Sequence, residues 1–513
     1  MKENEKIATE TVTGITDVFL GNLVSFIIGV IGSVLVARLL GPNGLGMVTI
    51  ALILPYILVI LGDLGVSQAA AKYTAEIKDQ DERSSIVSSG IAFSALYGVM
   101  LTIVGYFIAN IFATTVLNKP EVAFISSITI FLVFPNLINS FILQSFLGLD
   151  YTKPITILWS VSYGMNFLSA IILIYSGYGI LGPILGHVIG PFASLIVSLP
   201  FLYKRIKIKK PETRIIKKML RYGLPLQGGN FTIVFLRRVY DLLLARSASS
   251  TSIGNYAAAQ KFESVYNALL IPITLALLPA FSKLDSKKSK DDISIAFEYT
   301  IRYAAMLIVP LSLFTFIFAE SIINLILLDN FTEAPTYLRL IAISWCYIGS
   351  GQTILQTMLS GQGYTKTLMK TYVMVSPIGL ILALILIPKY GPVGLIITIL
   401  ITHWPQAILI YRAAKLKNEI EYPFSRMARV YLSAILAMIP IIIITNTVNN
   451  EIIKIGISAI IFLPTYTITS IVTKSINEAD IRIVDITIGN YAYIGGIVKK
   501  ILNIISITMM KIK

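Results

Sequence analysis

Residues 235–266 read FLRRVYDLLLARSASSTSIGNYAAAQKFESVY, a pattern that predicts two apolar helices joined by a short polar loop. Five charged residues interrupt the apolar parts: Arg237, Arg238, Asp241, Lys261 and Glu263. A charged side chain at bilayer depth is costly, so it normally faces a water-filled cavity or a partner. We therefore interpret the rest of the chain as a scaffold for a cationic cavity that these residues line.

The composition is typical of a membrane protein. Of the 513 residues, 55% are hydrophobic and only 13% are charged, whereas a soluble protein carries about 25% charged residues. Apolar runs of about 20 residues recur along the chain, which indicates transmembrane helices. The first run, 15–36, is too long for the core of a signal peptide, so we expect it to remain in the mature protein.

We predict an all-α membrane protein with about fourteen transmembrane helices. Several of these spans contain proline, which membrane helices tolerate where neighbours or cavity water satisfy the freed carbonyl groups. The predicted spans are roughly 15–36, 47–68, 86–110, 122–147, 154–175, 180–202, 222–245, 253–280, 293–319, 333–360, 367–388, 391–411, 428–446 and 452–473.

Lysine and arginine separate between the two sides of the predicted bundle. The N-terminus, alternate loops and the tail hold most of the 42 basic residues, whereas the intervening loops hold only Arg38, Lys119, Arg246, Lys389 and Lys454. The positive-inside rule then places both termini in the cytoplasm of a protein embedded in the cell membrane. This topology accounts for the net charge of +15, so we expect no nucleic-acid partner.

Short motifs recur at nearly one offset, which indicates an internal duplication. The offsets lie between 208 and 213 residues, and both halves contain six predicted helices, so the halves share one orientation. Their pseudo-twofold axis is then expected along the membrane normal. The matched motifs are Ala37-Arg38 and Gly46 with Ala245-Arg246 and Gly254, Ile142-Leu143-Gln144 with Ile354-Leu355-Gln356, Tyr151-Thr152-Lys153 with Tyr364-Thr365-Lys366, and Tyr178-Gly179 and Gly182 with Tyr390-Gly391 and Gly394.

The duplication suggests how the chain is divided, and the substrate site is expected between the two lobes. The basic linker is either a topology anchor on anionic lipid or a docking strip for a cytoplasmic partner. The tail is expected to be an amphipathic helix on the cytoplasmic face, with a fifteenth span as the alternative. The predicted segments are an N-terminal six-helix lobe (1–203), a basic cytoplasmic linker (204–221), a C-terminal six-helix lobe (222–412), an appended helix pair (413–473) and the tail (474–513).

Several motifs resemble a known family. They are VARLLGPNGLG at 36–46, LGDLG at 61–65, AKYTAE at 71–76, RYGLPLQGG at 221–229 and IGNYAAAQKFE at 253–263. These motifs resemble the polysaccharide-biosynthesis flippases of the multidrug, oligosaccharidyl-lipid and polysaccharide (MOP) exporter superfamily. The resemblance implies two six-helix lobes forming a V around a central cavity. It also implies a lipid-linked oligosaccharide substrate, whose phosphate or pyrophosphate head group is held by basic cavity residues and carried to the outer leaflet by alternating access.

The charged residues of the quoted stretch have two interpretations. As a cavity patch, Arg237, Arg238 and Lys261 bind the head group, since arginine offers a phosphate a bidentate fork, and Asp241 and Glu263 are their charge partners. As a structural network, the same residues pair between the two helices, and Asp241, one turn beyond Arg237, would pair with Arg237 or with Lys261. The equivalent positions in the first half carry no charge, which favours a ligand.

Two arginines elsewhere are secondary candidates for the head group. Arg302 lies one helical turn after Glu298, so an exposed pair with Glu298 or snorkelling to the membrane surface would also explain it. Arg339 lies at a similar distance inside its own predicted helix and has the same two interpretations.

Asp63 is an acid well inside the first half, between Gly62 and Gly65. It either caps a break in the helix or binds a coupling proton or cation. A coupling role is what the nearest alternative function needs, because a cation-coupled multidrug antiporter exchanges its ion at a membrane-buried carboxylate. The net basic cavity suits an anionic substrate better than a cationic drug.

A membrane glycosyltransferase or polymerase is the alternative from another functional class. Such an enzyme needs an acidic catalytic loop, often with a metal, but the longest outer loop offers only Glu320 and Asp329. One cysteine, Cys346, and two scattered histidines are poor material for a metal site. We therefore expect a transporter with no catalytic residues, no metal and no cofactor.

Overall fold

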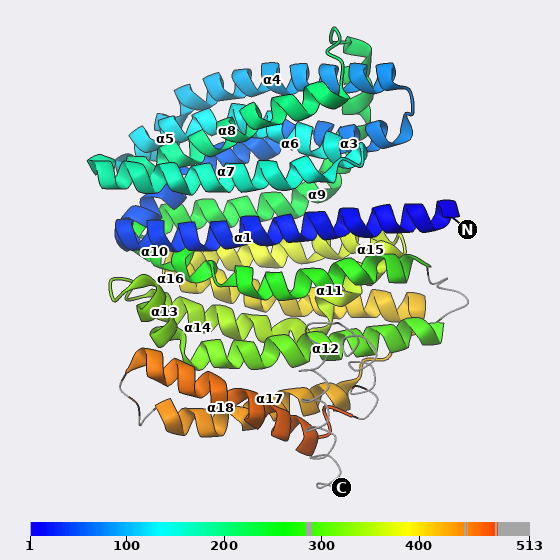
Figure 1. Ribbon diagram of the computed structural model, residues 1–513. Coiled ribbons are helices and arrows are strands. Elements are labelled where there is room, and N and C mark those ends of the chain that lie inside the picture. Colours follow the sequence, from blue (N-terminus) through cyan, green and yellow to red (C-terminus); the bar gives the residue numbers. More distant parts are fainter. Residues whose placement is uncertain (1, 284–289, 446–447, 449, 478–479, 481–513) are drawn as a thin grey trace. The chain divides into compact units, whose positions relative to one another are not determined.

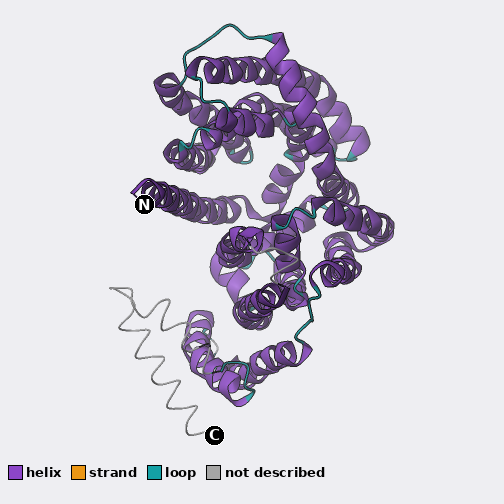
Figure 2. Cartoon of the chain, turned by 90° about the vertical axis from the view of Figure 1, so that its right-hand side faces the viewer, coloured by secondary structure: helices purple, strands orange, loops and turns teal. Residues whose placement is uncertain are grey.

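The computed structural model describes residues 2–283, 290–445, 448, 450–477 and 480, and its elements in that part of the chain are helical (Figures 1 and 2). The chain divides into two compact units, which we describe separately. The first is Met1–Ala258 with Leu380–Leu395, and the second is Ala259–Gly379 with Ile396–Lys513. The segment boundaries expected at 203, 221, 412 and 473 stay a prediction, and the tail beyond 480 lies outside the described residues.

The first unit is built around the packing of long helices. In Figure 1, α7 lies along α8 and against α1, and α6 packs on α3 and α4. Its core contains Val66, Phe141 and Phe146, all nearly inaccessible to solvent. Its helices are α1 (Lys2–Ala51), α2 (Ile53–Asp63), α3 (Val66–Glu76), α4 (Gln80–Ile111), α5 (Ala123–Thr129), α6 (Val133–Gly148), α7 (Thr152–Leu173), α8 (Leu181–Arg205), α9 (Thr213–Ser247) and most of α10 (Ser250–Gln260), with short turns η1 (Phe112–Val116), η2 (Pro120–Val122), η3 (Ile130–Leu132) and η4 (Ile174–Tyr178).

The second unit has its own core, to which α12 contributes Phe297, Ile301 and Ile308. The long helix α16 belongs to it at both ends, while residues 380–395 of that helix belong to the first unit. Its helices are α11 (Glu263–Lys283), α12 (Lys290–Ile317), α13 (Ala319–Leu327), α14 (Ala334–Trp345), α15 (Gln352–Gly361), α16 (Thr365–Asn418), α17 (Phe424–Thr445) and α18 (Glu451–Val472), with a short turn η5 (Cys346–Ser350).

Among the described residues, nine helical segments are long and apolar enough to cross a membrane. This confirms the predicted helical membrane fold, whereas the number fourteen stays a prediction. Two of the nine segments, Ser25–Asp63 and Thr365–Asn418, each overlap two predicted spans. Three predicted spans, 222–245, 253–280 and 333–360, are not represented among these nine segments of the described chain.

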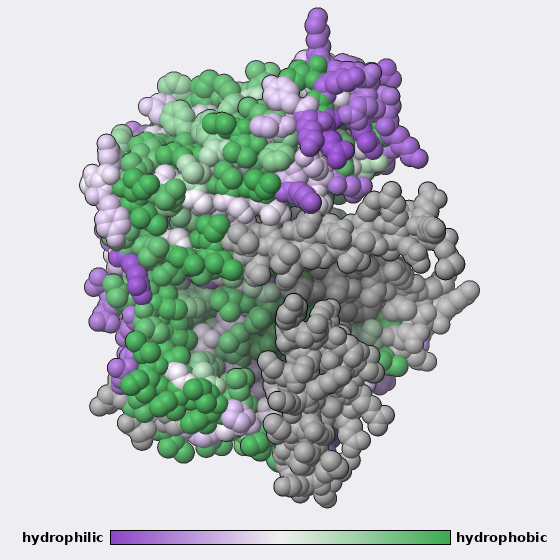
Figure 3. Space-filling model, in the orientation of Figure 1, coloured by the Kyte–Doolittle hydropathy of each residue, from purple (hydrophilic) through white to green (hydrophobic). Residues whose placement is uncertain are grey.

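On the face that Figure 3 shows, the surface of the described helices is largely apolar, with hydrophilic residues gathered near its edges. On α4, the side chains of Leu96, Met100, Ile103 and Phe107 recur every three or four residues, and between 45% and 76% of each is exposed. A soluble protein rarely exposes a continuous apolar stripe of this kind. A lipid bilayer accounts for it, because hydrocarbon tails cover such a stripe at no free-energy cost.

The backbone carries the predicted duplication. Gly179 and Gly391 are equivalent in the repeat, and they adopt nearly the same conformation, with φ 51° and ψ −122° at Gly179 and φ 56° and ψ −130° at Gly391. Positive φ is readily accessible only to glycine. At Gly391 it bends α16 between two predicted spans, so the glycine of each repeat performs the same local task.

A second pair of equivalent glycines meets within the first unit. A Cβ atom on Gly46 would lie 1.7 Å from the carbonyl oxygen of Ser250, and a Cβ atom on Gly254 would lie 1.7 Å from the carbonyl oxygen of Pro42. Pro42 and Ser250 are themselves related by the 208-residue offset. The contact is thus reciprocal, as expected where a pseudo-twofold axis relates two segments.

We predict that Gly46→Ala and Gly254→Ala each lower the stability of the purified protein by about 1–3 kcal/mol or more, because a methyl group would collide with backbone that cannot yield. Gly164→Ala in α7 is the matched control, since nothing lies within 4 Å of the added atom. Thermal unfolding in detergent measures the difference. Equal stability of all three variants would show that the reciprocal contact is absent.

Candidate functional site

The charges of α9 form one local ion pair. Arg238 Nη1 lies 2.8 Å from Asp241 Oδ2, three residues further along the helix. The two side chains are 27% and 31% exposed, so part of each remains available. The Nε atom of Arg238 is buried and donates no hydrogen bond. Asp241 therefore neutralises Arg238, and not Arg237 or Lys261 as the sequence suggested, and it leaves the Nε donor of Arg238 unused.

Arg237 differs from its neighbour. Its side chain is exposed on α9. Among the described residues, no carboxylate lies within ion-pair distance of it. Arg237 is thus a cation in an apolar helix that forms no ion pair with a described carboxylate, although its charge also acts on Asp241.

Lys261 and Glu263 belong to the second unit and sit at a break in the helix. α10 ends at Gln260 and α11 begins at Glu263, with Lys261 and Phe262 in a turn between them. The sequence predicted one continuous span over 253–280, so the structure differs from that prediction at this break. Interrupted membrane helices occur where the freed backbone lies against protein or lines an aqueous cavity. The break therefore marks Lys261, whose side chain is half-buried, as a position of interest.

The same break exists in the first half without the charge. α1 ends at Ala51 and α2 begins at Ile53, so Leu52 marks the interruption, 208 residues before Gln260. The positions equivalent to Lys261 and Glu263 are Ile53 and Pro55. The fold needs the break in both halves, but only the second half places charge there.

Arg302 lies in a closed network in the second unit. It is 2% exposed and forms an ion pair with Asp480, which is 5% exposed. The Tyr303 hydroxyl donates to Asp480 at 2.8 Å, and the rings of Tyr299 and Tyr303 lie 5.0 and 5.3 Å from the guanidinium. The partner is thus not Glu298, which pairs instead with Arg426. The geometry gives Arg302 a structural role, and its role in head-group binding stays a prediction.

Asp480 also closes a reciprocal cap with Asn477. The Asn477 N–H donates to Asp480 Oδ2 at 2.8 Å, and the Asp480 N–H donates to Asn477 Oδ1 at 3.0 Å. Sequence reasoning missed this residue because it lies 178 positions from Arg302. The Asn-x-x-Asp spacing, typical of a capping box, was the one local signal available.

Arg339 forms an exposed pair. Its Nη2 atom lies 3.1 Å from Glu320 Oε2, with 37% and 66% of the two side chains exposed. Glu320 is the acid that the sequence offered to the enzyme alternative, and here it serves as the arginine's partner.

Asp63 lies at a helix break, as one of its two interpretations required. It is the last residue of α2, and Leu64 and Gly65 follow in the left-handed conformation before α3 begins. The Ser67 hydroxyl donates to its carboxylate. The coupling-ion interpretation stays a prediction.

These features define a class: a multi-pass helical membrane protein with interrupted helices, some of which carry charge. The chain belongs to the polysaccharide biosynthesis protein family, whose model matches residues 35–336. This confirms the resemblance that the sequence motifs suggested.

The chain is also similar to individual proteins. An uncharacterized membrane protein of Methanocaldococcus jannaschii is 20% identical over 457 residues, 83% of this chain and 88% of that protein. A putative O-antigen transporter of Shigella dysenteriae is 26% identical over 296 residues, 55% of this chain and 73% of that protein. The solved structure of the lipid II flippase MurJ, inward closed, matches with a TM-score of 0.76 at 18% identity, covering 88% of this chain and 97% of MurJ, which shows a shared fold.

We predict that Asp480→Leu lowers stability by about 3–5 kcal/mol, because it leaves the Arg302 guanidinium buried without a counter-charge. The double variant Arg302→Met/Asp480→Leu should recover most of that loss. Arg339→Gln, which breaks an exposed pair, should change stability by no more than about 1 kcal/mol. Unfolding midpoints in detergent test this set, and a double variant no more stable than Asp480→Leu would contradict the network.

Proposed function

We propose that this protein is a flippase that moves a lipid-linked oligosaccharide from the cytoplasmic to the outer leaflet by alternating access. The observation that carries the proposal concerns two cations that form no ion pair with a carboxylate of the described chain, Arg237 on α9 and Lys261 at the break before α11. The positions equivalent to these two cations in the first half are Gly29 and Ile53, which carry no charge. The scaffold therefore does not require these charges, and a substrate anion accounts for them.

The chemistry of the site suits a phosphate or pyrophosphate head group. Arg237 and Arg238 offer planar forks that bind two oxygens at once, and Lys261 offers a compact point charge. Asp241 holds Arg238 in place without neutralising Arg237. With Glu263 as a further charge partner, the set is net positive by one, so an arriving dianion is attracted and yet can be released.

The family and its members support a saccharide-lipid substrate. The matching model describes polysaccharide biosynthesis proteins, and the names of two similar proteins refer to an O-antigen transporter and a lipid II flippase. Both names concern transport in glycan assembly. The location that fits is the cell membrane, with both termini in the cytoplasm as the distribution of basic residues predicts.

We predict that Arg237→Ala and Lys261→Ala each reduce flipping about tenfold or more, because each removes a charge-assisted contact to the head group. The assay is the appearance of lipid-linked oligosaccharide at the outer leaflet in cells deleted for this gene and complemented with each variant. Expression of every variant is measured in the same membranes. Lys389→Ala, which removes an exposed lysine that is not assigned to the site, is the control and should retain most activity.

Unimpaired flipping by Arg237→Ala and Lys261→Ala would remove these residues from the site. Loss of flipping by Lys389→Ala to the same degree would instead point to a general effect of removing positive charge.

Asp63 is the observation that keeps a cation-coupled multidrug antiporter as the second candidate. Its carboxylate at a helix break is where a coupling proton or cation would bind. Under our proposal, expression of the wild type confers no drug resistance, and Asp63→Asn affects flipping only if the flippase is itself ion-coupled. Drug resistance that Asp63→Asn abolishes, with flipping unchanged, would favour the antiporter over the flippase.

A further inference from the structure

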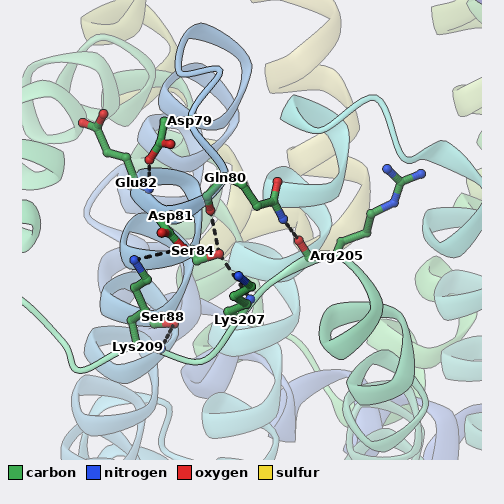
Figure 4. A network of polar contacts seen from close by, with 9 residues as sticks. All are labelled: Asp79, Gln80, Asp81, Glu82, Ser84, Ser88, Arg205, Lys207 and Lys209. Carbon is green, nitrogen blue, oxygen red and sulfur yellow. Dashed lines mark hydrogen bonds and ion pairs between the residues drawn. The ribbon is translucent and has the colours of Figure 1, made fainter.

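The basic segment at 204–221 consists of two different structures. Residues 206–212 are an extended strap, and α9 begins at Thr213. The strap lies along the start of α4, as Figure 4 shows. Both belong to the first unit.

Serine hydroxyls on α4 hold the strap by its backbone. The N–H groups of Lys207, Lys209 and Glu212 donate to the hydroxyls of Ser84, Ser88 and Ser89 at 3.2, 3.0 and 2.9 Å. The side chain of Gln80 donates to the carbonyl oxygen of Arg205. These donors are therefore unavailable to a partner protein, which argues against a docking strip in this half of the segment.

Acids on α4 also offset part of the strap's charge. The Lys209 ammonium lies 3.3 Å from Asp81, and Asp79 and Glu82 lie close by on the same turn (Figure 4). Asp79 caps α4 by accepting from the Glu82 N–H at 2.7 Å. The strap is consequently a mixed-charge surface.

The first three turns of α9 are different, because their charge has one sign. Arg214, Lys217, Lys218 and Arg221 are all exposed and recur every three or four residues, so they share one face. Among the described residues, no carboxylate is within ion-pair distance of these four. Like charges at this spacing destabilise a helix. An anionic surface would relieve that repulsion.

The opposite face of these turns is fixed to the core. Ile215, Ile216, Leu220 and Tyr222 pack against the first unit's central apolar cluster, and Met219 is part of it. The basic face, which we define as Arg214, Lys217, Lys218 and Arg221, is therefore displayed on a rigid support. A basic amphipathic segment of this type is typical of a membrane surface.

Lys72 of α3 joins the basic face through two tyrosines. Lys72 Nζ lies 4.3 Å from the ring centre of Tyr222, and Lys218 Nζ lies 4.6 Å from that of Tyr73, with the two ring centres 5.7 Å apart. The helices approach closely because Gly65 and Gly223 meet, where a Cβ atom on Gly65 would lie 2.2 Å from the Gly223 carbonyl oxygen. Glu76, 3.6 Å from Lys72, is the acid at this point, and it is 57% exposed.

We propose that the basic face of α9, together with Lys72, binds the phosphate groups of anionic phospholipids. Its place along the helix fits, because the face ends where the predicted span 222–245 begins, at head-group level. Tyrosine is also typical of that level. The interaction is distinct from substrate transport, since it uses none of the residues assigned to the cavity.

The experiment uses the full-length protein in neutral detergent micelles containing phosphatidylcholine or increasing phosphatidylglycerol, with the thermal midpoint as readout. Lys217→Gln/Lys218→Gln/Arg221→Gln removes three charges from the basic face. Lys204→Gln/Lys207→Gln/Lys210→Gln removes three exposed charges from the end of α8 and the strap and is the matched control. We expect phosphatidylglycerol to stabilise the wild type and the control. The basic-face variant should need roughly tenfold to a hundredfold more phosphatidylglycerol than the wild type for the same rise in thermal midpoint.

Three results would overturn the proposal. One is a basic-face variant that responds to phosphatidylglycerol as the wild type does. Another is an equal loss of stabilisation by phosphatidylglycerol in both triple variants, which would indicate a general attraction between the lipid and positive charge. The third is stabilisation of the wild type by glycerol phosphate to the same extent as by phosphatidylglycerol, which would indicate a site for free phosphate. If the triple variant does not fold in phosphatidylcholine, Lys218→Gln alone should raise the amount needed about fivefold, and no change would refute the proposal.

Discussion

A charged side chain inside an apolar helical bundle must acquire a partner. The charged residues of this structure meet that requirement in different ways. Arg302 acquires Asp480 and two tyrosine rings, and both charges are sealed from solvent. Arg238 acquires Asp241 three residues away. Arg237 and Lys261 stand apart, because no acid of the described chain lies within ion-pair distance of either. In the function that we propose, an anionic glycolipid is the partner that Arg237 and Lys261 acquire.

The duplication explains why these charges can be separated from the requirements of the fold. Gly46 and Gly254 meet in a reciprocal contact, and Gly179 and Gly391 share one unusual backbone conformation, so the two halves follow the same structural rules. The helix breaks at Leu52 and after Gln260 follow those rules too. Since both halves have the break and one has the charge, the break belongs to the scaffold, and we propose that the charge serves the function.

The sequence was informative where the relevant signal is local or periodic. Apolar runs predicted the helical membrane fold, and short motifs that recur at nearly one offset predicted the duplication. It was uninformative where partners are distant. Nothing near Arg302 indicates that Asp480, 178 residues later, would replace Glu298 as its counter-charge. Nor did the basic composition of 204–221 reveal that α4 serines would hold one half of the segment and leave the other free.

The most direct test of the central claim is whether Arg237 and Lys261 face water and receive the head group. Cys346 is the only cysteine, so Cys346→Ala provides a background for Arg237→Cys, Lys261→Cys and, as a control on the exposed apolar stripe of α4, Phe107→Cys. The account predicts that a charged, membrane-impermeant thiol reagent labels positions 237 and 261 in proteoliposomes, that it spares position 107, and that a lipid-linked pyrophosphate protects the first two. Positions 237 and 261 that stay unlabelled, or that label without protection by the lipid, would contradict it.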